Sequence, residues 1–158
     1  FGESVGYDNT AGTNHYHMPL LLFVIQDDNI KSQIAAQALI SNETAESYQW
    51  VLHITKKATQ KRVPNIFVID SDPAMKSAIS TEYPTTHHIL CIWHLKENLK
   101  KMLHEKLGPT FVDFYSAFWR CHNSDISDLF YYYWKELIEN YPAANQYFQK
   151  HLYKWRKS

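Results

Sequence analysis

The stretch NIFVIDSDPAM, residues 65–75, joins a continuous apolar run to two carboxylates and a proline. The apolar run is bounded by turn-forming residues, which predicts a buried central strand. Asp72 directly precedes Pro73, and this order predicts that Asp72 caps a helix whose first residue is Pro73. Asp70 has no such structural role in the sequence, so it is the better candidate for a metal ligand.

Segments on both sides of this stretch predict the rest of an α/β domain. Further strands are predicted at residues 3–8, 18–27, 32–41 and 87–93. Helices are predicted at residues 43–61 and 73–83. Three adjacent strands are therefore followed by a helix, a strand, a helix and a strand. This order predicts an RNase H-like mixed sheet of about five strands with flanking helices.

The last third of the chain has a helical pattern. Four helices are predicted, at residues 95–107, 110–121, 125–140 and 143–156. Their many aromatic residues suit a packed helical bundle. We therefore expect a core over residues 1–107 and an all-helical segment over residues 108–158. A first strand so close to Phe1 and an end without a closing element lead us to expect a piece of a longer protein.

The composition excludes several classes of protein. Sixteen basic and 16 acidic residues give a formal net charge of zero, which argues against binding driven by charge alone. Two cysteines are too few for a disulfide scaffold and fit a reducing compartment. No apolar stretch approaches the roughly 20 residues that span a bilayer, so we expect no membrane partner.

Asp8 and Asp70 are the candidate catalytic and metal-binding residues. Each ends a predicted strand, and these two strands are neighbours in an RNase H-like sheet. Two adjacent carboxylates repel unless a cation lies between them or one is protonated. Mg²⁺ or Mn²⁺ suits oxygen ligands of this kind, and two such ions can drive phosphodiester chemistry. Spacing alone leaves open the alternative that the strand-end acids only start the next helix.

Four motifs follow one another along the chain: YDNTAGTNHYHMPLLLFV (7–24), ALISNETAESYQWVL (38–52), NIFVIDSDPAMKSAI (65–79) and HHILCIWHLKENLKK (87–101). In order and spacing they resemble the Mutator-like (MULE) transposase domain, which also occurs in plant transcription factors of the far-red-impaired-response type. The helical tail resembles the start of the all-helical insertion of these transposases. The resemblance covers most of residues 5–107.

The resemblance implies an RNase H-like fold and a D-D-E triad that binds two divalent metal ions, Mg²⁺ or Mn²⁺. Asp8 and Asp70 match the first two acids. The family glutamate follows the insertion, so we expect the third ligand outside this chain and expect the chain alone to be inactive. Glu136 and Glu139 match the insertion instead. Acids on a helix surface are usually only solvated.

Two further groups of residues are candidates for other roles. Cys91 and His94 match a Cys-x-x-His motif of the family, whose role we expect to be structural or in positioning DNA. The motif is also half of a zinc site, with Cys121 and His122 as an awkward second half. Lys96, Lys100 and Lys101 on the next helix are candidate DNA contacts, as is a second basic cluster at residues 56–62, although either group is equally an ordinary solvated surface.

The resemblance leads to two functional hypotheses. In the first, the chain is part of a transposase catalytic domain that cleaves DNA at transposon ends and joins it to a target. In the second, it comes from a domesticated, non-catalytic relative that regulates transcription by binding DNA. Both imply DNA as the partner and a nuclear location, and a homo-oligomer is an expectation for the full-length protein.

Overall fold

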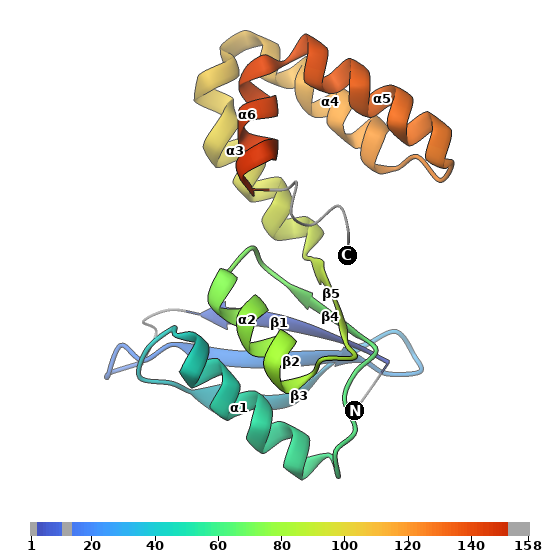
Figure 1. The fold of residues 1–158 in the computed structure, drawn as a ribbon. Coiled ribbons are helices and arrows are strands. Elements are labelled where there is room, and N and C mark those ends of the chain that lie inside the picture. The colour runs from blue at the N-terminus through green and yellow to red at the C-terminus, as the bar shows by residue number, and fades with distance from the viewer. Residues whose placement is uncertain (1–2, 11–13, 152–158) are drawn as a thin grey trace. The chain divides into compact units, whose positions relative to one another are not determined.

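The computed structural model describes residues 3–10 and 14–151 (Figure 1). They form two compact units, one up to Leu95 and one from Lys96 onward, and each unit is described by itself. The division between these units falls inside a helix. The domain boundary predicted at residues 107 and 108 stays a prediction, because compactness does not identify where an inserted domain begins.

A five-stranded mixed sheet in the order β3-β2-β1-β4-β5 forms the first unit. The strands are β1 Ser4–Thr10, β2 Leu20–Gln26, β3 Ser32–Leu39, β4 Ile66–Ile69 and β5 His87–Leu90. Strands β1, β2 and β3 pair antiparallel, and β1, β4 and β5 pair parallel. This is the RNase H-like order, and it confirms the fold class expected from the order of the elements.

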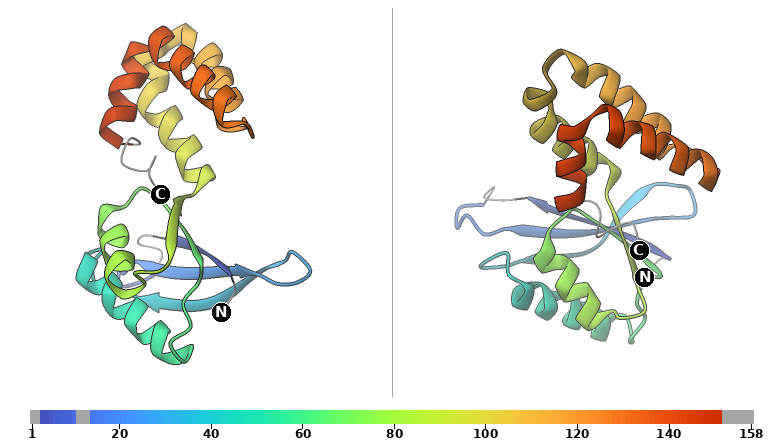
Figure 2. Two further views of the ribbon diagram at one scale, coloured as in Figure 1. Left: turned by 45° about the vertical axis from the view of Figure 1, so that its right-hand side comes forward. Right: turned by 45° about the horizontal axis from the view of Figure 1, so that its top comes forward.

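Helices α1 (Ala45–Ala58) and α2 (Pro73–Glu82) cover one face of the sheet, as both views in Figure 2 show. Alternate strand residues point toward these helices and are buried. They are Val5, Tyr7, Leu21, Phe23, Phe67 and Ile69. At the centre, the Phe67 ring lies 5.6 Å from the ring of Phe23 and 6.2 Å from that of Tyr83. Removal of this apolar area from water is the main source of the unit's stability.

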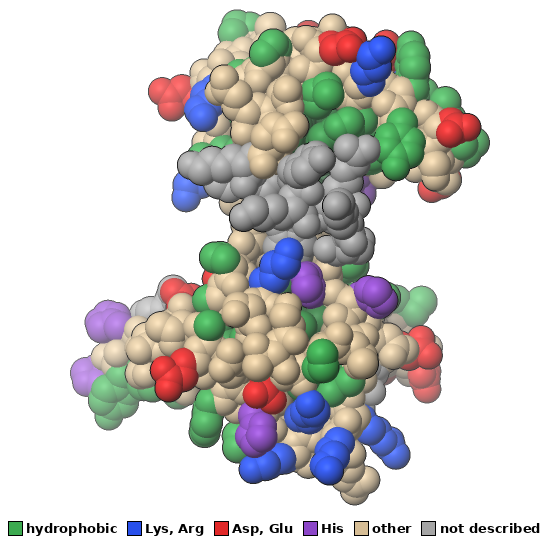
Figure 3. Space-filling model, in the orientation of Figure 1, with side chains coloured by type: hydrophobic (Ala, Val, Ile, Leu, Met, Phe, Trp, Pro, Cys, Tyr) green, Lys and Arg blue, Asp and Glu red, His purple; other side chains and the backbone are tan. Residues whose placement is uncertain are grey.

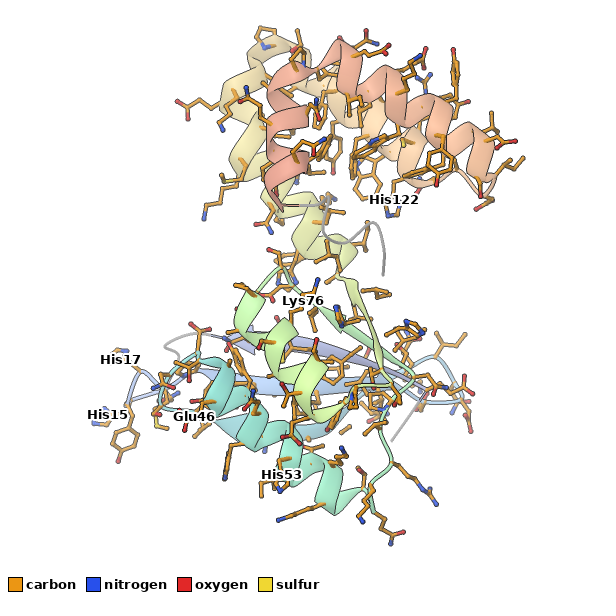
Figure 4. All side chains as sticks on the ribbon, in the orientation of Figure 1. His15, His17, Glu46, His53, Lys76 and His122 are labelled. Atoms are coloured by element: carbon orange, nitrogen blue, oxygen red, sulfur yellow. The ribbon has the colours of Figure 1, made fainter. Side chains whose placement is uncertain are left out.

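Helix α2 begins at Pro73, as the sequence predicts, whereas α1 begins at Ala45, two residues after the predicted start at residue 43. The Thr44 hydroxyl accepts a hydrogen bond from the Ser47 N–H at the start of α1, and Glu46 lies in the first turn (Figure 4). The Asp72 carboxylate accepts one from the Ala74 N–H, at 2.8 Å, at the start of α2. Each cap satisfies an N–H group that has no partner within its helix.

The end of the last strand differs from the prediction. The apolar run at 87–93 predicts a strand through Trp93, but β5 ends at Leu90 and helix α3 spans Ile92–Leu107. Cys91 lies between the two elements and bonds to the neighbours of each, because its N–H donates to the Ile69 carbonyl and its carbonyl accepts from the Leu95 N–H. Ile92 and Trp93 are 43% and 60% exposed. The apolar run therefore includes surface residues of a helix.

The second unit is helical and confirms the all-helical segment. After α3 follow η1 Gly108–Thr110, α4 Phe111–His122, α5 Ser127–Asn140 and α6 Pro142–His151. The rings of Phe114, Phe118 and Phe148 pack together in its core. Residues 152–156 of the last predicted helix lie outside the described residues. Within 3–10 and 14–151, no helix has the length and apolar character needed to cross a membrane.

Candidate metal centre

Asp8 and Asp70 lie at the same level on neighbouring parallel strands. Strands β1 and β4 pair Ser4 with Ile66 and Gly6 with Val68. Two residues further along, this register brings Asp8 level with Asp70, which directly follows β4. Since Gly6 and Val68 occupy equivalent positions in the pleat, the two aspartates also share one face of the sheet. The structure thus brings together the two acids singled out from the sequence.

The environments of the two carboxylates differ. Asp8 has a side chain that is 57% exposed. Burial raises the pKa of the Asp70 carboxyl, and the charges of Asp72 and Asp8 raise this pKa further, whereas the Asp72 N–H and His94 lower it. Asp70 is therefore a carboxylate whose negative charge is poorly compensated by its surroundings, which is a setting that favours a bound cation.

Asp70 also has a structural role that the sequence does not reveal. Its Oδ1 accepts a hydrogen bond of 3.0 Å from the N–H of Asp72. The expectation that Asp70 is free of structural duty is therefore wrong. A side chain that accepts from the N–H two residues ahead forms a local turn, and this turn orients the carboxylate while leaving a second oxygen to bind a cation.

His94 is the third polar group at this end of the sheet. Its Nε2 lies 4.0 Å from Asp8 Oδ1, which is beyond hydrogen-bonding distance. Its Nδ1 is buried and has no hydrogen-bond partner among the described residues. The Cys-x-x-His motif therefore has its histidine next to the candidate metal ligand Asp8, while Cys91 lies at the junction of β5 and α3.

The donor set fits a hard divalent cation. Carboxylate oxygens from Asp8 and Asp70 suit Mg²⁺ or Mn²⁺, which are commonly held by one or two carboxylates together with water and phosphate oxygens. Among the residues that the structure describes, no group of three His, Cys, Asp or Glu side chains could hold a metal ion by itself. The two aspartates thus offer a partial site, to which further ligands must be added.

Asp70 gives a prediction about stability and pH. The raised pKa means that the folded chain keeps this proton to a higher pH than the unfolded chain does. The resulting stabilisation is complete below the ordinary Asp pKa of about 4 and is lost as the pH rises through the raised value. We therefore expect Asp70→Asn to melt at a higher temperature than the parent at neutral pH without metal, and the gap to close below about pH 4. If the melting temperatures of Asp70→Asn and the parent differ by the same amount at every pH, this prediction is contradicted.

Cys121 lies in the second unit, where burial raises the pKa of its thiol to about 11. The residue is 1% exposed, and its thiol donates to the Phe130 carbonyl. These properties are those of a core cysteine. His122, the other member of the proposed second half of a zinc site, forms a hydrogen bond with Asn123.

The thiol of Cys121 should therefore react more slowly in the folded chain than in the unfolded chain. At about pH 8, we expect Cys121 in the folded chain to react with a disulfide reagent roughly 100-fold more slowly than in urea, because so little of it is thiolate. The variant Cys91→Ser isolates the Cys121 signal, and Cys121→Ser isolates that of half-buried Cys91. Fast reaction of Cys121 in the folded Cys91→Ser variant would show that the thiol is accessible.

The candidate DNA-contacting lysines lie on α3 among acids. Lys100 forms an ion pair of 3.1 Å with Glu97, and Lys96 and Lys101 lie on the same helix. In the first unit, Lys and Arg side chains gather near the end of α1 (Figure 3). Lys56 in this cluster donates to the Glu82 carbonyl and has a structural role. Contact of either group with DNA stays a prediction.

Glu136 and Glu139 of the helical unit each have a partner within that unit. Glu136 pairs with Arg120 at 3.3 Å and accepts a hydrogen bond from the Tyr132 hydroxyl. Glu139 lies 3.9 Å from Lys135. These are the ordinary surface interactions of helix residues, as the sequence leads us to expect.

Sequence reasoning missed two tyrosines beside the aspartates. The hydroxyl of Tyr7 on β1 donates a 3.2 Å hydrogen bond to that of Tyr48 on α1. Both residues are buried. Tyr7 immediately precedes Asp8 in the chain, and this adjacency is what the sequence offers to indicate that Tyr7 lies near the candidate site. Tyr48 lies 41 residues away, so its proximity depends on the packing of α1 on the sheet.

The chain is similar in sequence to curated plant proteins. Two Arabidopsis thaliana relatives match nearly all of it: protein FAR1-RELATED SEQUENCE 5, 28% identical over 99% of this chain, and protein FAR-RED IMPAIRED RESPONSE 1, 24% identical over 98%. The chain spans about a fifth of the length of these curated relatives, 20% and 19% respectively.

Among solved structures, the catalytic core domain of BIV integrase matches with a TM-score of 0.39 and 15% identity, over 70% of this chain and 72% of that one. A simian T-cell lymphotropic virus intasome matches with a TM-score of 0.43 and 16% identity, over 85% of this chain and 46% of that one.

A family model decides the assignment. The model of the MULE transposase domain matches residues 4–98. This range contains the whole sheet, both flanking helices, and Asp8, Asp70 and His94. The chain belongs to the MULE transposase domain family.

Proposed function

We propose that this chain is part of the catalytic core of a Mutator-like DNA transposase that acts in the nucleus. In this proposal, Asp8 and Asp70 bind Mg²⁺ or Mn²⁺. The observation that carries the proposal is the register of β1 and β4, which brings both carboxylates to the same level and face of the sheet. A structural need would not require a second acid at that level, because like charges placed together lower stability.

In this proposal each residue has a defined task. Asp8 and Asp70 supply oxygen ligands, and the third acidic ligand implied by the family comes from outside this chain. The bound metal would supply a Lewis acid for the phosphodiester oxygens of DNA. Asp70 is held by the Asp72 N–H, so its carboxylate keeps one orientation. His94 lies beside Asp8, where it can donate a hydrogen bond to a phosphate oxygen.

The alternative is a domesticated DNA-binding regulator without catalysis. The similarity of nearly the whole chain to FAR1-related proteins supports it. This alternative keeps the fold and DNA as the partner, but it does not require metal at Asp8 and Asp70. The two functions therefore differ in whether the aspartates matter for an activity that depends on metal.

The deciding experiment uses the longer protein that contains this chain, with a DNA substrate carrying the element's ends and Mg²⁺ or Mn²⁺. If the chain is catalytic, DNA cleavage and joining require metal and are lost in Asp8→Asn and Asp70→Asn. The control is Asp28→Asn, which changes an exposed acid in the loop between β2 and β3. DNA binding without cleavage in the parent, unchanged in all three variants, would support the regulator.

A further inference from the structure

One edge of the sheet is open at strand β3 (Figure 1). In the order β3-β2-β1-β4-β5, β3 pairs with β2 on one side and has no strand on its other side among the described residues. Every second residue of such an edge strand directs its N–H and C=O groups away from the neighbouring strand. These backbone groups are available to pair with a further strand.

The sequence of β3 does little to protect this edge. Natural edge strands are commonly guarded by charged residues or proline, but β3 has the sequence SQIAAQAL and contains neither. A shift in register leaves Ala35 without a partner on β2, and residues 36–39 then pair with β2 without interruption. Residues 36–39 are therefore the stretch along which a further strand would fit.

Two hollows adjoin this stretch, and Leu39 lines both of them. The first, of about 480 Å³, is also lined by Asn14, Leu20 and residues 37–38. The second, of about 490 Å³, lies between the end of β3 and the start of α1, where Glu46 and Trp50 line it. Successive side chains of a strand point in opposite directions. Two hollows at the end of β3 can therefore receive side chains of an added strand.

The hollow beside α1 has the chemistry of a site for a basic side chain. Glu46 (Figure 4) and Trp50 are four residues apart on α1, so their side chains are neighbours on the helix surface. Trp50 is 61% exposed, and Glu46 forms no ion pair within the described part of the chain. A cation between an indole ring and a carboxylate is attracted by both.

The same chemistry argues against nucleic acid at this edge. None of the described residues that line the two hollows is basic. Binding to DNA or RNA depends on Lys and Arg side chains that neutralise phosphates, and the Glu46 carboxylate would repel them. The occupant that fits the edge is therefore a polypeptide.

We propose that the β3 edge binds an extended segment of a partner protein, which adds to the sheet as a further strand and places a lysine or arginine side chain between Trp50 and Glu46. In such strand addition, main-chain hydrogen bonds supply affinity and pockets for alternate side chains supply specificity. The inference does not depend on the metal role of Asp8 and Asp70, because β2 separates β3 from the strand that carries Asp8.

A library of random nine-residue peptides, displayed on phage and selected against the 158-residue chain, tests the proposal. We expect the recovered peptides to share a lysine or arginine at one position, flanked by the β-branched and aromatic residues that favour strands. Recovery of peptides without a shared basic position, or no recovery above that on the empty support, would overturn the proposal.

Substitutions then locate the site at which a recovered peptide binds. Trp50→Ala should weaken binding about tenfold and Glu46→Gln about threefold. The matched controls are Trp93→Ala, which removes an indole that is 60% exposed on α3, and Glu105→Gln, which changes an exposed acid of the same helix. Both controls should bind the peptide as the parent does. If Trp93→Ala loses as much affinity as Trp50→Ala, the peptide is not bound at the β3 edge and the inference fails.

Hydrogen exchange separates strand addition from the capture of a side chain alone. The outward-facing amides of an edge strand exchange readily because they have no partner in the sheet. The bound peptide should slow exchange at such amides within residues 36–39. A peptide whose affinity depends on Trp50 and Glu46, but which leaves exchange along β3 as in the free chain, would show that no strand is added.

Discussion

Asp8→Ala and Asp70→Ala each lower the affinity of the chain for Mn²⁺ by about 100-fold or more, since removing a ligand should exceed the effect of removing a group behind it. The reason is the register of β1 and β4, which brings the two carboxylates to the same level of the sheet. A single carboxylate has little affinity for a hard cation, which needs several oxygen ligands. Titration followed by the electron paramagnetic resonance signal of free Mn²⁺ measures the loss.

The matched control for this prediction is Asp28→Ala. It removes the same charge from the chain as the other two variants but does so in an exposed loop. It should leave Mn²⁺ binding unchanged, which excludes a general effect of net charge. Full binding by either Asp8→Ala or Asp70→Ala would mean that the two aspartates do not share a cation.

Phe67→Ala destabilises the first unit by about 3–5 kcal/mol, the cost of removing a fully buried aromatic side chain from a packed core. Phe67 is 0% exposed, and its ring packs between those of Phe23 and Tyr83. A loss of this size approaches the whole stability of a typical domain, about 5–15 kcal/mol. We therefore expect this variant to be largely unfolded at mild urea concentrations.

Ile66→Ala is the control for this second prediction. Ile66 is the neighbouring residue of β4, is 38% exposed and points to the opposite face of the sheet. Its truncation should cost roughly 1–2 kcal/mol. Hydrogen exchange of the β1 and β4 amides in urea reports on the first unit alone, because the helical unit contributes no signal there. Equal losses for the two variants would contradict the assignment of the buried face.

Local features of the fold could be predicted because they depend on residues close in sequence. The strand at Ile66–Ile69 and the Asp72 cap followed by Pro73 both lie within one short stretch. The pairing of Asp8 with Asp70 needed one more step, the order of the elements, which implies that the two strands are neighbours. The end of β5 could not be placed, because Ile92 and Trp93 are apolar yet exposed on a helix.

The sequence by itself predicted the order of the elements, the RNase H-like sheet and the two candidate acids, because periodicity, caps and chain order are local or topological properties. Only the tertiary structure decided which buried side chains meet under the sheet. Tyr48 meets Tyr7 across 41 residues, and no spacing in the sequence encodes such a contact. The physical reason is that a hydrogen bond between buried side chains depends on how α1 packs against the sheet, which is decided by the core as a whole.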